Sequence, residues 1–188
     1  MTDLKKLTDY TNSLSNDFQL NSIITLAGRA LENEWKKFAQ QSLEDIHKSI
    51  DLNLLGHINV IHSFLPFLKK CTTDKSILMI SSINASEGFG LPAYSSSKSG
   101  LYGFVNSMTQ EFGNDGIRIN TVSPGTVVTP ATQTEPKNFD SLLKGTALGK
   151  FTTSEDVAKL VYEICNSFVS LTGQNIVLDA GQSLIHLQ

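Results

Sequence analysis

The sequence predicts an α/β fold with a parallel sheet. Short apolar runs alternate along the chain with longer segments whose apolar residues recur at helical spacing, which is typical of alternating strands and helices. The run at 77–80, Ile-Leu-Met-Ile, is apolar at every position, as expected of a strand buried on both faces. The composition agrees, because 188 residues with 40% hydrophobic and 18% charged content are ordinary for one globular domain over residues 1–188.

Three of the four expected helices begin at residues that are able to cap a helix, and Pro66 is expected to bend or end the second helix. In chain order, the elements are a helix starting at Thr2 and Asp3, a strand at 23–26, a helix starting at Ser42 and Asp45 with an apolar stripe to Leu65, a strand at 77–80, a helix starting near Tyr94, a strand at 117–122, a helix starting at Thr152 and Glu155, and a strand at 175–179.

Charge, hydropathy and cysteine content argue against several classes of protein. The net charge of -3, with no cluster of Lys and Arg, predicts no nucleic-acid partner. The N-terminus is polar and no apolar run approaches the roughly 18 residues of a membrane span, so we expect neither a signal peptide nor a membrane partner. Cys71 and Cys165 form no metal or redox pattern, which predicts no metal site and a reducing, cytoplasmic location.

The candidate chemistry is concentrated in the stretch 81–98. The strand at 77–80 ends at Ser81 and Ser82, a glycine-containing loop follows, and a helix begins near Tyr94. Tyr94 and Lys98 are four residues apart, so one face of that helix carries both side chains. Ligands bind to α/β sheets in the crevice at the carboxyl ends of the strands, where a serine can meet this face.

A lysine beside the tyrosine would make the phenol a usable acid and base. A phenol pKa is near 10, and an ammonium about 4 Å away contributes about 4 kcal/mol at an effective dielectric of about 20. We therefore expect Lys98 to lower the pKa of Tyr94 by about three units before burial opposes it, while a serine orients the substrate. Tyr-x-x-x-Lys alone is weak, because it occurs by chance in roughly a quarter of such chains. The alternative is a half-buried aromatic residue and a solvated lysine.

Four further segments share a pattern with the stretch Ile80-Ser81-Ser82 to Lys98. They are 51–56 (Asp-Leu-Asn-Leu-Leu-Gly), 118–125 (Arg-Ile-Asn-Thr-Val-Ser-Pro-Gly), 172–174 (Thr-Gly-Gln) and 179–181 (Asp-Ala-Gly). In their order and spacing the chain resembles the short-chain dehydrogenase/reductase family over nearly its whole length. The resemblance implies a Rossmann-like doubly wound parallel sheet of strand order 3-2-1-4-5-6-7. This chain would begin just after the third strand, and so would lack the first three strands and the Gly-rich phosphate-binding turn.

The resemblance also implies an oxidoreductase that transfers a hydride between NAD or NADP and a carbonyl or secondary alcohol. Tyr94 would be the general acid and base, Lys98 its activator and a ribose contact, Ser82 the substrate orienter and Asn53 a helper in proton relay. Ser81 stays an alternative to Ser82, since the 12 positions from Ser82 to Tyr94 are one fewer than in many members. From the residues alone, Asn53 is more simply a solvated or backbone-bonded asparagine within a helix.

Cofactor contacts are implied after two other strands. Thr25-Leu26 stands where the family has two asparagines, and a Pro-Gly turn alone would explain only part of the string that follows 117–122. The implied cofactor-binding residues are Ala27, Gly28, Tyr94, Lys98, Pro124, Gly125, Val127 and Thr129.

Substrate, partners and activity follow from the same resemblance. The polar segment 131–149 would be the substrate-binding lid, and the chain would form a homo-oligomer, either a dimer or a tetramer. The residue that separates NAD from NADP would lie upstream, so no preference is predicted. A hypothesis of another class is a catalytically inactive, truncated homologue that acts as an interaction or assembly protein.

Overall fold

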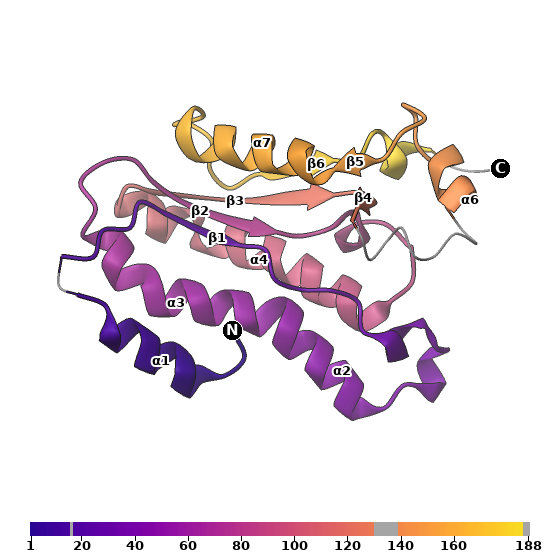
Figure 1. The fold of residues 1–188 in the computed structure, drawn as a ribbon, viewed down its shortest axis with the longest axis horizontal. Coiled ribbons are helices and arrows are strands. Elements are labelled where there is room, and N and C mark those ends of the chain that lie inside the picture. The colour runs from indigo at the N-terminus through magenta and orange to yellow at the C-terminus, as the bar shows by residue number, and fades with distance from the viewer. Residues whose placement is uncertain (16, 130–138, 186–188) are drawn as a thin grey trace.

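The computed structural model describes residues 1–15, 17–129 and 139–185. Its centre is a four-stranded parallel sheet in the order β1-β2-β3-β6, with helices on both faces (Figure 1). The strands are β1 (Ser22–Thr25), β2 (Lys75–Ile80), β3 (Ile117–Pro124) and β6 (Asn175–Leu178), and β4 (Val127–Val128) pairs separately with β5 (Thr152–Thr153). The predicted α/β class with a parallel sheet is therefore confirmed.

Helices α1 to α4 lie on one side of the sheet and α7 lies on the other (Figure 1). The α-helices are α1 (Leu4–Ser13), α2 (Leu43–Ile50), α3 (Gly56–Lys69), α4 (Pro92–Asn114), α6 (Phe139–Lys144) and α7 (Ser154–Asn166). A π-helical turn, η3 (Asp51–Leu55), joins α2 to α3, and the short 3-10 turns are η1 (Glu32–Trp35), η2 (Phe38–Gln40), η4 (Ile83–Ala85) and η6 (Gln182–Leu184).

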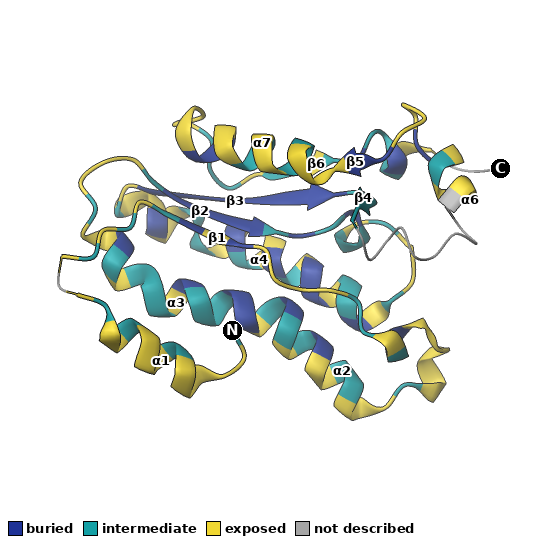
Figure 2. Ribbon diagram, viewed as in Figure 1, coloured by how far each residue is buried: buried dark blue, intermediate teal, exposed yellow. Residues whose placement is uncertain are grey.

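Strand β2 shows why the sheet is covered twice. Ile77 and Met79 belong to the core cluster that packs under α3 and α4, whereas Leu78 belongs to a second cluster with Ile164 of α7. Successive side chains of a strand point to opposite faces, so a run without polar residues needs a cover on each side. Figure 2 shows the central strands as the most continuously buried part of the molecule. The doubly wound architecture is thus confirmed.

The structure excludes an end of the helix at Pro66 and moves the cap of α7 by one residue. Helix α3 continues past Pro66 to Lys69, since a proline in the final turn removes only one backbone hydrogen bond. Helix α7 is capped by Thr153, whose side chain accepts from the Asp156 N–H while the Asp156 carboxylate accepts from the Thr153 N–H. The predicted cap at Thr152 is wrong by one residue, because Thr152 pairs with Val127 in the small sheet.

The carboxyl ends of β1, β2 and β3 point the same way, and the loops that follow them meet at one edge of the molecule (Figure 1). Strand β1 is the outermost strand, and no strand precedes it within the described residues. Part of the expected lid, residues 131–138, lies outside the described residues. Among the helices described, none combines the length and apolar character needed to cross a membrane.

Candidate active site

Tyr94 and Lys98 lie on the first turns of α4, beside the end of β2. The Lys98 Nζ atom is 5.8 Å from the centre of the Tyr94 ring, so the predicted common face is confirmed. Lys98 is only 3% exposed, and its ammonium donates a 2.8 Å hydrogen bond to the Ile80 carbonyl. The alternative of a solvated lysine is therefore wrong, because this ammonium is held inside the protein against the end of a strand.

The two serines after β2 face different partners. The Ser81 hydroxyl is buried and donates to the Lys98 carbonyl at 2.9 Å, which ties the strand end to the backbone of α4. The half-buried Ser82 side chain accepts from the Asn84 N–H at 3.2 Å and also interacts with the Tyr94 side chain. This orientation favours Ser82 over Ser81 as the hydroxyl that meets a substrate beside Tyr94.

The electrostatics of Tyr94 differ from the expectation. Burial raises its pKa above the usual value, the Ser82 hydrogen bond opposes this, and the charge of Glu34 raises it further. The predicted lowering of the Tyr94 pKa by Lys98 is wrong for this structure. The ammonium points to the Ile80 carbonyl and not to the phenol oxygen, and burial disfavours the tyrosinate.

Lys98 is itself tuned by burial, which lowers its pKa to about 8. An ammonium with that pKa stays mostly protonated at neutral pH, yet it releases its proton more readily than an exposed lysine. Lys98 therefore carries a positive charge at neutral pH and can release its proton near pH 8.

Asn53 is fully buried in the π-helical turn η3. Its Oδ1 accepts from the Arg29 N–H at 2.9 Å, and its Nδ2 donates to the carbonyls of Arg29 and Ser49 at 3.0 and 3.1 Å. The residue-level interpretation of a backbone-bonded side chain thus holds. A π-turn at this position is also the helix perturbation that the resemblance implied, since π-bulges accommodate side chains that interrupt the helical ladder.

Gly28 is the point where β1, Asn53 and Lys98 come together. A Cβ atom on Gly28 would lie 2.6 Å from Asn53 Oδ1 and 3.3 Å from Lys98 Nζ, and the φ of +150° also favours glycine. Only a residue without a side chain fits between this amide and this ammonium, and Ala27 and Gly28 are themselves exposed. These residues therefore fit the ribose side of a nicotinamide cofactor.

The Pro-Gly loop follows β3 at the same edge of the sheet. The Gly125 N–H donates to the Leu178 carbonyl at 3.0 Å, and a Cβ atom there would lie 2.7 Å from Asp179 Cβ. Gln182, which the sequence reasoning missed, accepts from the Thr126 N–H at 2.8 Å. The half-buried Val127 and Thr129 continue from this anchored turn.

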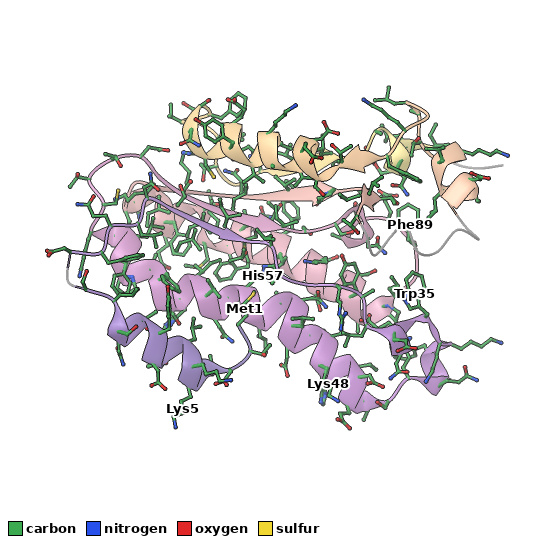
Figure 3. All side chains as sticks on the ribbon, in the orientation of Figure 1. Met1, Lys5, Trp35, Lys48, His57 and Phe89 are labelled. Carbon is green, nitrogen blue, oxygen red and sulfur yellow. The ribbon has the colours of Figure 1, made fainter. Side chains whose placement is uncertain are left out.

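His57 is a second residue that the sequence reasoning missed. It is fully buried on α3, just below β1 (Figure 3), and its Nδ1 lies 2.8 Å from Thr25 Oγ1. Burial lowers its pKa to about 4, and the charge of Lys98 adds to the effect. Thr25 and His57 are 32 residues apart in the chain, so no local spacing in the sequence indicated this pair.

Comparison with known proteins agrees with this geometry. The family described as enoyl-(acyl carrier protein) reductase matches residues 1–183. The chain is 32% identical over 148 residues to an uncharacterized short-chain type dehydrogenase/reductase, y4mP, of Sinorhizobium fredii. This alignment covers 76% of this chain and 58% of y4mP. It is also 33% identical over 141 residues to 3-oxoacyl-(acyl-carrier-protein) reductase FabG of Thermotoga maritima. This second alignment covers 73% of this chain and 57% of FabG.

Solved structures match over almost the entire chain. An oxidoreductase of the short-chain dehydrogenase/reductase family from Burkholderia thailandensis superposes with a TM-score of 0.86 at 28% identity, covering 98% of this chain and 71% of the other. Aldohexose dehydrogenase of Thermoplasma acidophilum shares the fold, with a TM-score of 0.89 at 20% identity and coverage of 100% and 77%. The chain thus spans a little over half the length of its curated relatives, and it belongs to the short-chain dehydrogenase/reductase family.

Proposed function

We propose that this chain carries the catalytic half of an NAD(P)-dependent oxidoreductase acting on a carbonyl or secondary alcohol. The observation that supports this is that Ser82, Tyr94 and Lys98 lie together at the carboxyl end of β2, while Lys98 and Asn53 meet at Gly28 after β1. A solved relative from Brucella melitensis carries bound NAD, and this supports a nicotinamide cofactor here. Preference between NAD and NADP is not part of the proposal.

When bound, the cofactor supplies or accepts the hydride, and the residues of this chain handle the proton. Tyr94 gives a proton to the carbonyl oxygen during reduction and takes it back during oxidation, with Ser82 holding that oxygen in place. Lys98 supplies a contact for the ribose, and its ammonium lies 5.8 Å from the centre of the Tyr94 ring. Asn53 holds the π-turn beside Gly28 by accepting a hydrogen bond from the Arg29 N–H.

The substrate would approach past three aromatic residues. A cavity of about 320 Å³ lies between the segment 34–41 and the loop 89–92, and its lining includes Trp35, Phe38 and Phe89. Trp35 and Phe89 lie on the side of the molecule to which the strands point (Figure 3). An apolar or aromatic substituent on the substrate fits such a lining.

The test uses the product of the complete reading frame that contains this chain. Tyr94→Phe removes only the transferable proton, so turnover of carbonyl substrates should fall at least about 1,000-fold while cofactor binding persists. Tyr102→Phe, an exposed tyrosine two turns further along α4, should retain activity. A Tyr94→Phe enzyme with most of its activity would refute the proposal.

A second candidate is an inactive homologue that serves in assembly. One observation favours it: β1 is the outermost strand of the sheet, with Ile24 exposed in it and Leu26 exposed just after it. Apolar strand edges pair readily with other chains. The nucleotide sequence upstream of the Met1 codon discriminates the two, because an in-frame Gly-rich segment there indicates an enzyme.

The proposal includes a homo-oligomer, either a dimer or a tetramer, in the cytoplasm. The exposed apolar residues along the sheet edge and helices support association, and the free Cys71 and Cys165 support a reducing compartment. Size-exclusion chromatography with light scattering tests the oligomer directly.

A further inference from the structure

The helix that carries Tyr94 begins without a cap of its own. Its N-cap residue, Leu91, has no side-chain acceptor and sits in the left-handed region with φ of +57°. The first helical residue is Pro92, which has no N–H. The Tyr94 N–H, in the first turn, therefore needs an acceptor from elsewhere in the chain, because the first amides of a helix lack intrahelical partners.

That acceptor is Glu34, 60 residues earlier in the chain. Its Oε2 accepts from the Tyr94 N–H at 2.8 Å. Its Oε1 accepts from the Leu31 N–H at 3.0 Å and from the Ser49 hydroxyl at 2.7 Å. The residue is only 3% exposed, so this carboxylate is buried with its hydrogen-bonding capacity in use. A buried carboxylate with these bonds has a specific structural or functional role, because carboxylates are otherwise rarely buried.

The same carboxylate reaches the second helix of the site. Ser49, which donates to Glu34, also accepts a 3.2 Å hydrogen bond from Asn53 Nδ2. Glu34 thus connects the start of the Tyr94 helix, the η1 turn and the Asn53 turn. A carboxylate at a helix N-terminus is stabilised by the helix dipole, and charge-assisted bonds to N–H groups are strong and directional.

We propose that Glu34 is a positioning residue that caps the Tyr94 helix from a distance and locks it to the Asn53 turn. A contribution of Glu34 to catalysis rests on the proposed function, whereas its hydrogen bond to the Tyr94 N–H does not. Within residues 1–15, 17–129 and 139–185, the groups that face Tyr94 besides Glu34 are the Ser82 hydroxyl from the loop after β2 and the Lys98 ammonium from α4, with His57 near Lys98. Among these, Glu34 adds negative charge and so disfavours the tyrosinate.

Two readouts on the full chain test this without turnover. The first is hydrogen exchange of the Tyr94 amide, which should be protected in the unaltered protein and exchange at least about tenfold faster in Glu34→Gln and Glu34→Ala. The second is the titration of the Tyr94 phenol by NMR, assigned with Tyr94→Phe. Its midpoint should move to lower pH in Glu34→Gln, since the neighbouring negative charge is gone.

Glu32→Gln is the matched control, because it removes an exposed carboxylate from the same η1 turn. It should leave both readouts unchanged. An unprotected Tyr94 amide in the unaltered protein would overturn the proposal, whatever the fate of the variants. Faster exchange without a shift of the Tyr94 midpoint would also overturn it, because a merely structural residue gives that result. Shifts in both readouts in a protein without oxidoreductase activity would support Glu34 and refute only the proposed function.

Discussion

The buried His57 makes the free energy of unfolding depend on pH between about pH 6.5 and pH 4, and a substitution of this residue can test that dependence. The folded pKa is about 4 against 6.5 for the free side chain, so the unfolded chain takes up a proton first as the pH falls. Acid therefore favours unfolding, and stability that is present above pH 6.5 is lost as the pH falls toward 4. At about 1.4 kcal/mol for each unit, the whole effect is about 3 kcal/mol, of which about 2 kcal/mol falls between pH 7 and pH 5.

The perturbation is His57→Gln, which keeps a polar partner for Thr25 and removes the titration. Urea unfolding followed by circular dichroism at pH 7, 6 and 5 measures the free energy of unfolding. The unaltered protein should lose about 2 kcal/mol more than His57→Gln over this range. Asp156, whose pKa the Thr153 backbone N–H holds below its usual value, titrates at lower pH and adds little in this window.

His62→Gln serves as the control, because His62 is exposed on the same helix α3. It should keep the pH dependence of the unaltered protein. Equal losses in the unaltered protein and in His57→Gln would refute the reasoning, since the buried imidazole would then not be the group that binds the proton.

Three further outcomes are expected. In the product of the complete reading frame, Ser82→Ala should lower kcat by at least about 100-fold, whereas Ser81→Ala should mainly lower Tm; a larger kcat loss for Ser81→Ala would reverse the assignment. Gly28→Ala should weaken cofactor binding in calorimetry, because its Cβ would meet Asn53, whereas Gly103→Ala in an open part of α4 should leave binding unchanged. The 188-residue chain itself should bind NADH and NADPH poorly and associate in light scattering, because its sequence holds no Gly-rich phosphate turn; tight binding by a monodisperse sample would contradict this.

Local patterns in the sequence determined the architecture and the central pair of the site. The apolar run at 77–80 required a strand covered on both faces, and the spacing of Tyr94 and Lys98 required a common helix face. Both predictions follow from local backbone geometry, so they can be made from the sequence without knowledge of the fold. The same holds for the position of Gly28 just after a strand, which the sequence predicted.

Tertiary structure alone decided the charges and the supports around that pair. Glu34 bonds to Tyr94 from 60 residues away in the sequence, and Thr25 contacts His57 from 32 residues away. No local spacing in the sequence therefore predicts either contact. The Tyr94 pKa is raised and not lowered because burial acts on it and the Lys98 ammonium turns to the Ile80 carbonyl. Desolvation and long-range hydrogen bonds depend on what packs over a group, and packing exists only once the chain has folded.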